Sequence, residues 1–428
     1  MDVTLVNAPV RKRNEHARLS PPLGLAYIAS ALMEDGFSVS AVDFNVSGLN
    51  LVRVNSILAN DRPRIVGISA MTETYPQALE IARHIKERSP ETVVVIGGAH
   101  PTILPEEVLA ERDAVDFIVA GPGEDAMVAL ARNVVRGEGS LADVPGLGFI
   151  EDDAPHVNPR AELGHPDDLP RPARWLFPTD FYHDKWNVLT ATGSCPYRCP
   201  FCSASSLWQG RRRMRSPESI AAEIADLWRE HGVDEVFFTD DIFTLNRRWI
   251  GELLEALGAL EHPVEWGCAT RVDLVDADLI RQMAEAGCTG IQFGVESGSQ
   301  TVLDSVKGIE KQQVRDAVAA AVACGIDAVC SFMIPFPDDT PETLRESLEF
   351  MAEVHELGAR IYLSYTCPFP GTDFYDRAAE LGLTILTDDW GDFDAKHVVI
   401  ETRHLTAPQV EATAEAMAAA LGMKKSDI

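Results

Sequence analysis

Three cysteines lie within one short stretch, Thr192-Gly-Ser-Cys-Pro-Tyr-Arg-Cys-Pro-Phe-Cys-Ser-Ala204. Their CxxxCxxC spacing puts three thiolates on a single loop, where they can hold three irons of a 4Fe–4S cubane. Such clusters normally take four thiolates, and the next cysteine, Cys268, lies beyond an expected strand and helices. One iron is therefore expected to stay open for a ligand from outside the protein. A structural zinc site would need a fourth Cys or His at finger spacing, and residues 203–209 offer neither.

The cysteine loop follows the first strand of a regular alternation of strands and helices. Strands are expected at 188–192, 235–239, 264–269, 290–295, 328–334 and 360–365, and helices at 217–231, 247–260, 276–286, 311–324 and 341–357. Six βα units of this length predict a partial or full parallel barrel, in which the chemistry lies at the C-terminal ends of the strands. Two further helices are expected at 373–382 and 407–421.

Polar side chains follow the other strands of this series, at the edge where the cysteine loop lies. They are Asp240 and Asp241, Arg271, Glu296 and Ser297, and the runs 335–339 and 366–372. Each has an ordinary alternative, since an aspartate after a strand often caps a helix and an arginine often forms a salt bridge. Their shared edge nevertheless indicates a site. Cys367 is expected to be a small buried hydrophobe, with hydrogen-atom donation in catalysis as its alternative role.

The N-terminal third shows a second alternation. Strands are expected at 3–7, 38–43, 65–70, 93–98 and 117–120, and helices at 22–36, 75–87 and 106–111. This pattern predicts an α/β domain with a doubly wound parallel sheet, whose ligands bind beyond the carboxyl ends of the strands. Small residues and glycines there would let a large ligand approach the backbone, although tight turns are the simpler explanation. The stretch 146–185 is rich in proline and aspartate and lacks a period, so we expect a linker, apart from a hairpin strand at 147–150.

Composition limits the function further. A length of 428 residues suggests two or three domains, and a hydrophobic content of 46% supports a sizeable core. The net charge of −29 argues against nucleic-acid and membrane-surface partners. The chain opens without a signal-peptide pattern and has no 18-residue apolar run. Its eight cysteines fit a reducing compartment, so we expect a cytoplasmic protein.

The cysteine stretch, with Phe201 directly before the third cysteine, resembles the radical S-adenosylmethionine (SAM) superfamily. Over residues 1–385 the chain resembles the branch with an N-terminal cobalamin-binding-type domain. The further matching runs are Pro21-Pro-Leu-Gly-Leu-Ala-Tyr27, Gly97-Gly-Ala-His-Pro-Thr102, Gly121-Pro-Gly-Glu124, Phe238-Thr-Asp-Asp-Ile-Phe243, Phe293-Gly-Val-Glu-Ser-Gly298 and Pro368-Phe-Pro-Gly-Thr372. The resemblance implies a Rossmann-like cobalamin-binding-type domain over 1–145, a linker over 146–185, a partial (βα)6 radical SAM barrel over 186–385 and a short C-terminal helical extension over 386–428.

The resemblance also implies the cofactors and their contacts. Cys195, Cys199 and Cys202 would bind the 4Fe–4S cluster, and the open iron would bind SAM, whose reductive cleavage gives a 5′-deoxyadenosyl radical. The implied SAM contacts are the Phe201 backbone, Asp240, Arg271, Glu296, Ser297 and Arg215, the last from a basic run over 211–215 that otherwise reads as a solvated loop. Cobalamin, if bound, would lie on Ser69, Thr72, Gly97, Gly98 and Gly121.

The reaction stays open at this stage. No DxHxxG motif is present, and His16, His84 and His100 are expected to be hydrogen-bonding residues instead of metal ligands. Our leading hypothesis is hydrogen abstraction from an unactivated carbon of a small, natural-product-like metabolite, followed by cobalamin-dependent methylation. The alternatives are a cobalamin-independent dehydration or rearrangement of an aminosugar or polyol, and a non-catalytic iron–sulfur or zinc protein that senses redox state or binds a partner. A one-electron donor such as flavodoxin or ferredoxin is implied, with the run 211–215 as a candidate docking place.

Overall fold

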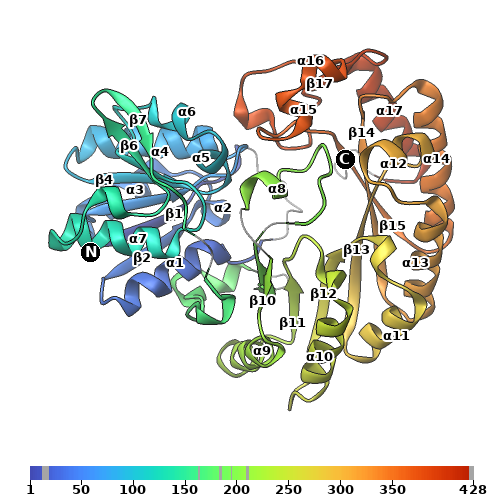
Figure 1. Ribbon diagram of the computed structural model, residues 1–428, viewed down its shortest axis with the longest axis horizontal. Coiled ribbons are helices and arrows are strands. Elements are labelled where there is room, and N and C mark those ends of the chain that lie inside the picture. Colours follow the sequence, from blue (N-terminus) through green and yellow to red (C-terminus); the bar gives the residue numbers. More distant parts are fainter. Residues whose placement is uncertain (12–18, 162–163, 183–185, 194, 209–211, 424–428) are drawn as a thin grey trace. The chain divides into compact units, whose positions relative to one another are not determined.

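The computed structural model describes residues 1–11, 19–161, 164–182, 186–193, 195–208 and 212–423. The chain forms two compact units. The first comprises Met1–Asp184 with Ser206–Arg211 and Asp389–Gly391, and the second comprises Lys185–Ser205, Arg212–Asp388 and Asp392–Ile428. Figure 1 colours the first unit mainly blue to green and the second mainly green to red.

The first unit is built on a seven-stranded sheet in the order β2-β1-β3-β4-β5-β6-β7. Neighbouring strands from β2 to β5 are parallel, and β5, β6 and β7 pair antiparallel. The strands are β1 (Val3–Asn7), β2 (Val39–Asp43), β3 (Ile65–Ser69), β4 (Val93–Gly97), β5 (Phe117–Val119), β6 (Leu147–Glu151) and β7 (Ala154–Val157). The helices are α1 (Leu23–Glu34), α2 (Phe44–Ser47), α3 (Leu51–Asn60), α4 (Tyr75–Arg88), α5 (Ala99–Ile103), α6 (Pro105–Leu109) and α7 (Glu124–Ala131), which continues into a π-helical turn, Arg132–Arg136.

Helices cover both faces of this sheet (Figure 1). On one face α1 packs against α7, and Leu25 and Leu130 belong to one apolar cluster. On the other face Ile81 of α4 and Val108 of α6 belong to a second cluster. Because both faces are covered, the parallel strands read as apolar runs and not as alternating patterns. This confirms the predicted doubly wound α/β domain.

The hairpin β6–β7 lies within the stretch 146–185, where we expected a linker apart from one hairpin strand at 147–150. The predicted strand at 147–150 is confirmed as β6, which pairs with Ile118 and Val119 of β5. Asp152 and Asp153 make the turn to β7 with φ angles of +48° and +63°. The first sheet therefore continues beyond residue 146. A four-residue strand such as β7 carries too little of a pattern to be separated from a loop by sequence.

The second unit is built on a six-stranded parallel sheet in the order β15-β14-β13-β12-β11-β8. The chain adds each strand beside the previous one, and β8 and β15 remain at the two edges, which makes a partial barrel. The strands are β8 (Trp186–Val188), β11 (Glu235–Phe238), β12 (Glu265–Thr270), β13 (Cys288–Glu296), β14 (Asp327–Ile334) and β15 (Arg360–Tyr365). A two-stranded ribbon pairs β9 (Ala191–Thr192) with β10 (Arg213–Met214), and α8 (Ala204–Leu207) follows the cysteines.

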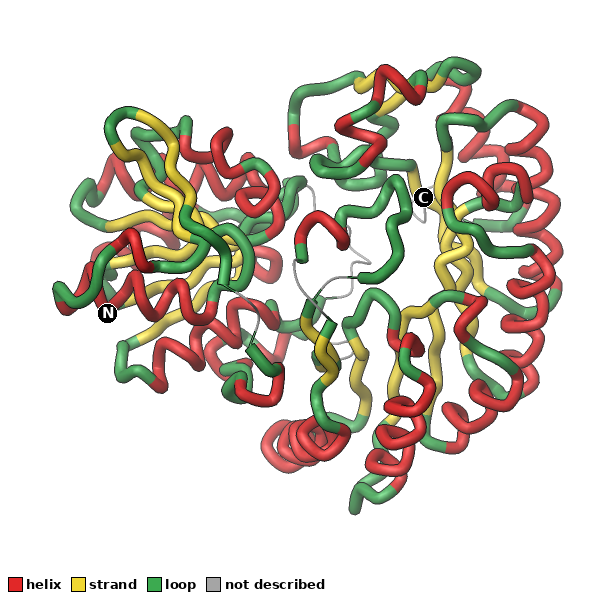
Figure 2. The backbone as a smooth tube through the Cα atoms, viewed as in Figure 1, coloured by secondary structure: helices red, strands yellow, loops and turns green. Residues whose placement is uncertain are grey.

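Helices line the outside of this curved row of strands (Figure 2). They are α9 (Pro217–His231), α10 (Arg247–Gly258), α11 (Ala277–Glu285), α12 (Gln300–Val306), α13 (Lys311–Ala323) and α14 (Pro341–Glu356). Their boundaries follow local chemistry. Helix α9 begins after Ser216, whose hydroxyl accepts the Ser219 amide hydrogen, and ends at Gly232 in the left-handed region. The predicted partial (βα)6 barrel is confirmed.

The C-terminal part differs from the expected helices. The single helix expected at 373–382 is two short helices, α15 (Asp373–Asp376) and α16 (Ala378–Leu381), because Arg377 leaves the helical region with φ −120° and ψ 23°. The chain then forms an antiparallel pair, β16 (Leu383–Ile385) and β17 (Ile400–Thr402), before the predicted last helix, α17 (Ala407–Ala420). The region after residue 385 is therefore not wholly helical.

Candidate functional site

The cysteine loop lies between β9 and α8, at the C-terminal end of the first barrel strand. Cys195 and Cys199 are half-buried and Cys202 is exposed, and all three are free thiols. The Cys202 amide donates to the Cys199 carbonyl at 3.0 Å, which folds the loop into a turn. No three described His, Cys, Asp or Glu side chains are grouped to hold a single metal ion. In a cubane each thiolate instead binds its own iron, and three thiols on one turn provide that set.

An aromatic cluster packs around the cysteine loop on one side. Phe201 lies 5.8 Å from Phe336 and 6.2 Å from Phe374, measured between ring centroids. The Phe374 amide also donates to the Pro200 carbonyl at 3.2 Å. These contacts tie the loop to the end of β14 and to α15.

Asp240 follows β11 as predicted, but its carboxylate is already occupied by the protein. It accepts from the Thr190 amide at 3.1 Å and the Thr190 hydroxyl at 2.5 Å. It also pairs with Arg212 at 3.0 Å, where its side chain is 1% exposed. Asp240 therefore ties β11 to the segment before the cysteine loop, and its neighbour Asp241 is the exposed carboxylate at this edge.

Arg215 is neither a solvated loop residue nor free to meet a ligand. Its guanidinium pairs with Glu223 at 2.6 Å, and the two side chains are 4% and 2% exposed. It also donates to the Leu189 carbonyl at 2.9 Å and the Ser219 hydroxyl at 3.0 Å. The role implied for Arg215 with the SAM carboxylate is therefore not supported. Arg211, at the start of the basic run, lies outside the described residues.

Arg271 lies beside the cysteine loop, as the sequence suggested. It forms a two-pronged pair with Asp273 at 2.9 and 3.0 Å and donates to the Lys307 carbonyl at 3.1 Å. Its guanidinium carbon is 4.0 Å from the ring centroid of Tyr197, a loop residue. Arg271 and Lys307 both act electrostatically on Cys199: burial raises the pKa of this thiol, and the two cations oppose the rise.

Glu296 and Ser297 end the fourth strand, β13, within a local irregularity. The register with β14 shifts between Gly294 and Glu296, and Glu296 has a φ of +78°. Its carboxylate pairs with Lys307 at 2.6 Å. Ser297 is buried, and its hydroxyl accepts the Ser299 amide hydrogen at 3.2 Å.

Cys367 is 5% exposed, which agrees with its expected role as a small buried residue. Cys268, Cys288 and Cys330 are buried as well. Beside Cys367, the Thr366 hydroxyl is buried and has no hydrogen-bond partner among the described residues. The alternative role of Cys367 as a hydrogen-atom donor stays a prediction.

Small residues and half-buried glycines lie at the carboxyl ends of the strands in the first unit, and two of the glycines pack closely against the protein itself. Gly98 has a φ of +106°, and a Cβ there would lie 2.5 Å from the Ala70 carbonyl oxygen. Gly121 has a φ of +96° and faces the Arg160 side chain. Met71 is 49% exposed at the same edge. Gly97, Ser69 and Thr72 belong to the same strand ends, where the Thr72 side chain is buried. Small residues with one exposed apolar side chain fit a large flat ligand such as a corrin.

His100 departs from the hydrogen-bonding role expected for it. It stacks on Tyr75 with 4.1 Å between ring centroids and meets the edge of Trp390 at 5.2 Å. Both ring nitrogens are buried and have no partner among the described residues, and burial lowers the pKa of His100 to about 4. His84, in contrast, bonds to Asn55 at 2.8 Å as expected. His16 lies outside the described residues.

Tyr197 and Lys307 are candidate site residues that the sequence did not assign, and Asp241 was placed at this edge but not among the SAM contacts. Tyr197 stands inside the cysteine motif and could have been singled out there. Asp241 stood beside the residue that was chosen. Lys307 directly follows α12, and its ammonium group bonds to Glu296, eleven positions earlier in the chain. No sequence pattern predicts this contact.

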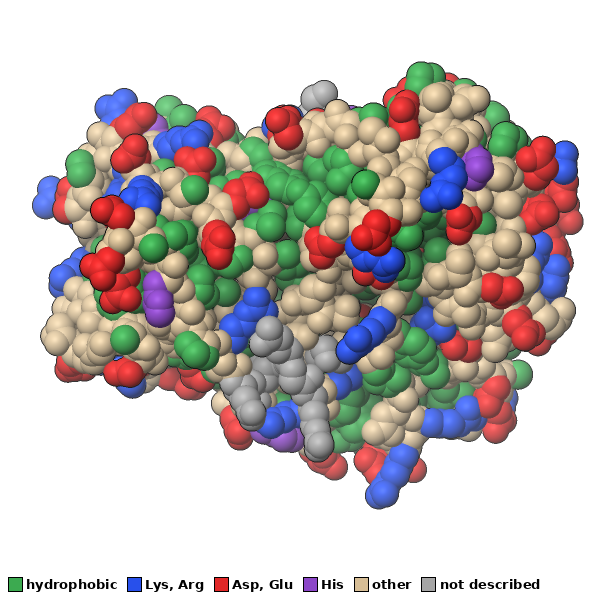
Figure 3. All heavy atoms as spheres, turned by 45° about the horizontal axis from the view of Figure 1, so that its top comes forward, with side chains coloured by type: hydrophobic (Ala, Val, Ile, Leu, Met, Phe, Trp, Pro, Cys, Tyr) green, Lys and Arg blue, Asp and Glu red, His purple; other side chains and the backbone are tan. Residues whose placement is uncertain are grey.

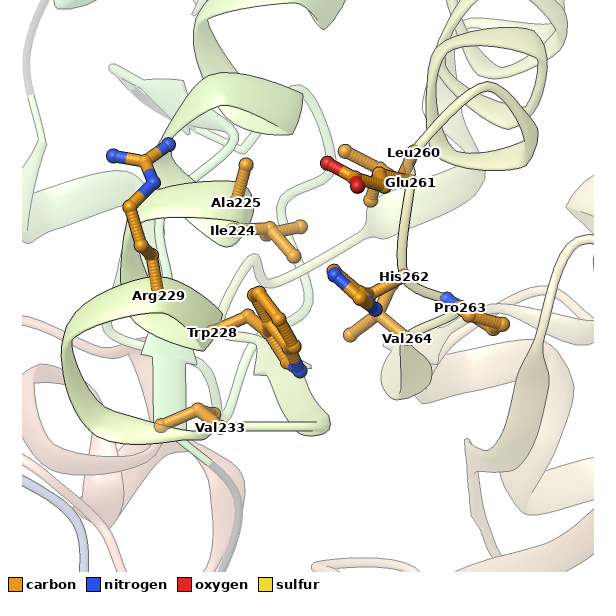
Figure 4. A pocket seen from close by; sticks show the side chains of 10 residues that line it. All are labelled: Ile224, Ala225, Trp228, Arg229, Val233, Leu260, Glu261, His262, Pro263 and Val264. Carbon is orange, nitrogen blue, oxygen red and sulfur yellow. The ribbon is translucent and has the colours of Figure 1, made fainter.

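A surface pocket lies at the opposite ends of the barrel strands. Figure 4 shows Trp228 of α9 facing His262, and their rings stack with 3.3 Å between centroids. Ile224, Val233 and Val264 also line it. Val233 and Val264 precede β11 and β12, whereas the cysteine loop follows β8. The pocket is therefore separate from the candidate site.

Acidic and basic side chains are interspersed on the face drawn in Figure 3. None of the helices in the described ranges combines the length and apolar character that crossing a bilayer requires.

Comparison with known proteins gives two matches to family models. The B12 binding domain matches residues 15–131, and the Radical SAM superfamily matches residues 189–351. An uncharacterised methyltransferase of Pyrococcus horikoshii is 31% identical over 395 residues, which cover 91% of this chain and 85% of that protein. The anaerobic magnesium-protoporphyrin IX monomethyl ester cyclase of Rubrivivax gelatinosus is 30% identical over 373 residues, which cover 84% of this chain and 66% of that protein.

Among solved structures, the chain is similar to the radical S-adenosylmethionine methyltransferase TsrM of Kitasatospora setae, solved with cobalamin and a [4Fe-4S] cluster bound. The TM-score is 0.74 at 20% identity, and the match covers 91% of this chain and 78% of that chain. At this identity the likeness shows the fold alone.

Proposed function

Because this chain belongs to the radical SAM enzymes that carry a B12-binding domain, we propose that it methylates an unactivated carbon of a small molecule with the help of cobalamin. The two family matches and the relative from Pyrococcus horikoshii confirm the resemblance to radical SAM enzymes with a cobalamin-binding domain. The observation that carries the proposal is the pairing of two sites in one chain. One is a three-cysteine loop at the mouth of a parallel barrel, and the other is a glycine-lined strand edge in a B12-binding domain.

The residues divide between the cofactors as follows. Cys195, Cys199 and Cys202 would hold the cluster, and SAM would bind beside it at the barrel mouth. When bound, the reduced cluster supplies the electron that cleaves SAM, and cobalamin supplies the methyl group. The residues proposed to contact SAM are the Phe201 backbone and Asp241. Arg271, Glu296 and Ser297 lie at the same edge, but their side chains are buried and already bonded within the protein, as are those of Asp240 and Arg215. Those proposed to contact cobalamin are Ser69, Thr72, Gly97, Gly98 and Gly121.

The protein's own part is to order these groups and to exclude water. Phe201, Phe336 and Phe374 surround the cysteine loop with apolar rings. A site that makes a carbon radical needs such surroundings, since the radical would otherwise take hydrogen from whatever lies near. Lys307 supplies a positive charge next to Glu296, so the buried carboxylate is paired.

The two alternative functions have less support. The relatives do not support a dehydratase or lyase, and the radical SAM assignment favours an enzyme over a redox sensor or a structural zinc protein. A natural-product substrate remains a proposal, because of the two relatives described above only the cyclase of Rubrivivax gelatinosus has a name that specifies a compound, magnesium-protoporphyrin IX monomethyl ester. An acidic one-electron donor of the flavodoxin or ferredoxin kind and a cytoplasmic location also remain proposals.

The test is anaerobic reconstitution of the full chain with iron, sulfide, reductant, hydroxocobalamin and SAM carrying a deuterated methyl group. We expect 5′-deoxyadenosine, a corrinoid spectrum that survives desalting, and deuterated methyl on bound methylcobalamin or on product. A cluster without 5′-deoxyadenosine would exclude the enzyme. Formation of 5′-deoxyadenosine by a protein that retains no corrinoid would exclude the cobalamin-dependent methylation. Cys199→Ala should abolish the visible cluster band, and Cys367→Ala should retain it as the matched control.

A further inference from the structure

The cysteine loop is held on both sides of Cys199. Phe201, between the second and third cysteines, lies in the aromatic cluster with Phe336 and Phe374. Tyr197, between the first and second cysteines, lies under the guanidinium of Arg271 at 4.0 Å. We propose that the Tyr197–Arg271 stack is a brace that positions the Cys195–Cys199 half of the loop before iron arrives. The inference rests on the proposed function, in which these cysteines bind the cluster.

Arg271 is a rigid platform for such a brace. It is 5% exposed, its Nε and one Nη2 hydrogen go to the two oxygens of Asp273, and Nη2 also donates to the Lys307 carbonyl. Three bonds in one plane fix the orientation of the guanidinium. A planar cation held in this way can stack on an aromatic face, which a flexible ammonium does less well.

Tyr197 in turn stabilises the buried guanidinium of Arg271. Nη1 of Arg271 is buried and has no hydrogen-bond partner among the described residues. A buried cation with an unused donor is costly, and the electron-rich face of an aromatic ring stabilises such a cation. The Tyr197 ring lies 4.0 Å from the guanidinium carbon, against a cation whose Nη1 makes no hydrogen bond among the described residues. The contact needs the ring and not the phenolic oxygen.

A loop braced in this way loses less freedom when it binds iron. Cation–π contacts of this kind change an equilibrium by about two- to thirtyfold. Cluster retention should therefore fall by that order when the ring is removed. Tyr197 and Arg271 act through the cysteines, so both are positioning residues in this role.

The test compares the full chain as wild type, Tyr197→Phe, Tyr197→Leu and Arg271→Lys. Each is reconstituted anaerobically with iron and sulfide, and the rate of iron loss to a ferrous chelator is measured. We expect Tyr197→Leu and Arg271→Lys to lose iron about three- to thirtyfold faster than wild type. Tyr197→Phe keeps the ring and should stay within about twofold of wild type. Equal rates of iron loss from Tyr197→Phe and Tyr197→Leu, or a wild-type rate from Tyr197→Leu, would contradict the proposed brace.

A second measurement separates the brace from the proposed function. Arg198, inside the loop, is exposed, so trypsin can cleave after it once the loop opens. In the metal-free chain we expect Tyr197→Leu to be cut at Arg198 severalfold faster than wild type, and Tyr197→Phe to be cut at the wild-type rate. This result holds even if the wild type binds no cluster, which would refute the proposed function alone. Equal cleavage of all three chains would refute the brace alone.

Discussion

Nζ of Lys307 lies 2.6 Å from Oε1 of Glu296, and the two side chains are only 8% and 10% exposed. The same ammonium donates to the Gly294 carbonyl at 2.6 Å. Glu296 has a φ of +78°, a conformation that costs a residue with a side chain about 1–3 kcal/mol. The lysine therefore holds the end of β13 in a strained shape and neutralises the carboxylate that the strain turns inward.

Breaking this pair from one side should be more harmful than removing it. Lys307→Met leaves a buried carboxylate without its counter-ion, and we expect a loss of about 3–5 kcal/mol in the free energy of unfolding. The double variant Lys307→Met with Glu296→Leu leaves no unpaired charge and should recover most of that loss. Urea denaturation of the metal-free chain measures both. A single variant as stable as wild type would show that the pair is not needed for the fold.

We expect Asp240 to stabilise the fold and Asp241 to contact the ligand. Asp240→Asn weakens the buried contact with Arg212 and should cost about 3 kcal/mol of stability. Asp241→Asn changes an exposed side chain and should alter stability by about 0.5 kcal/mol or less. It should, however, weaken SAM binding to the reconstituted protein about tenfold, the size of one charge-assisted hydrogen bond. Equilibrium dialysis with labelled SAM measures the second effect, and unchanged affinity would remove Asp241 from the site.

The sequence predicted both aspartates at this edge and named only Asp240 as a SAM contact. A motif predicts that an aspartate follows β11, but consecutive residues at a strand end point to opposite sides. Only the partners, Thr190 and Arg212, show which aspartate is turned inward. The same limit applies to Arg215, whose buried partner Glu223 becomes its neighbour only when α9 forms.

The fold was more predictable than the site because its signals repeat. Each βα unit carries an apolar strand, a cap and an amphipathic helix, and α9 was predicted with its observed bounds. Contacts such as Lys307–Glu296 and Tyr197–Arg271 depend on where turns place single side chains. No periodic pattern encodes them. Short elements such as β7 and β16 were missed for the same reason.

Gly98 should be irreplaceable at the strand edge proposed for cobalamin. In Gly98→Ala the new Cβ would lie 2.5 Å from the Ala70 carbonyl oxygen at a φ of +106°. Strain and clash together should cost about 3 kcal/mol or more and displace the start of α5, which begins directly after Gly98. Gly48→Ala is the matched control, since its φ is +73° and nothing lies within 4 Å of its Cβ. It should cost only about 1–2 kcal/mol.

The binding readout for this pair is hydroxocobalamin retained after desalting, measured from its visible spectrum. We expect Gly98→Ala to lose the corrinoid and Gly48→Ala to keep it. Retention by both variants, with Gly98→Ala still folded, would place the corrin elsewhere.

His100 should make the stability of the first unit depend on pH. Burial lowers its pKa to about 4, so between about pH 6.5 and 4 the unfolded chain binds a proton that the folded chain does not. The stabilisation is complete above pH 6.5 and is lost as the pH falls toward 4, by up to about 3 kcal/mol. His100→Phe keeps the stack on Tyr75 and removes the titrating group. The variant should therefore gain stability over wild type increasingly as the pH falls from 7 to 4.5, which urea midpoints at several pH values can measure. A constant difference between the two proteins would mean that His100 binds its proton equally well in the folded chain.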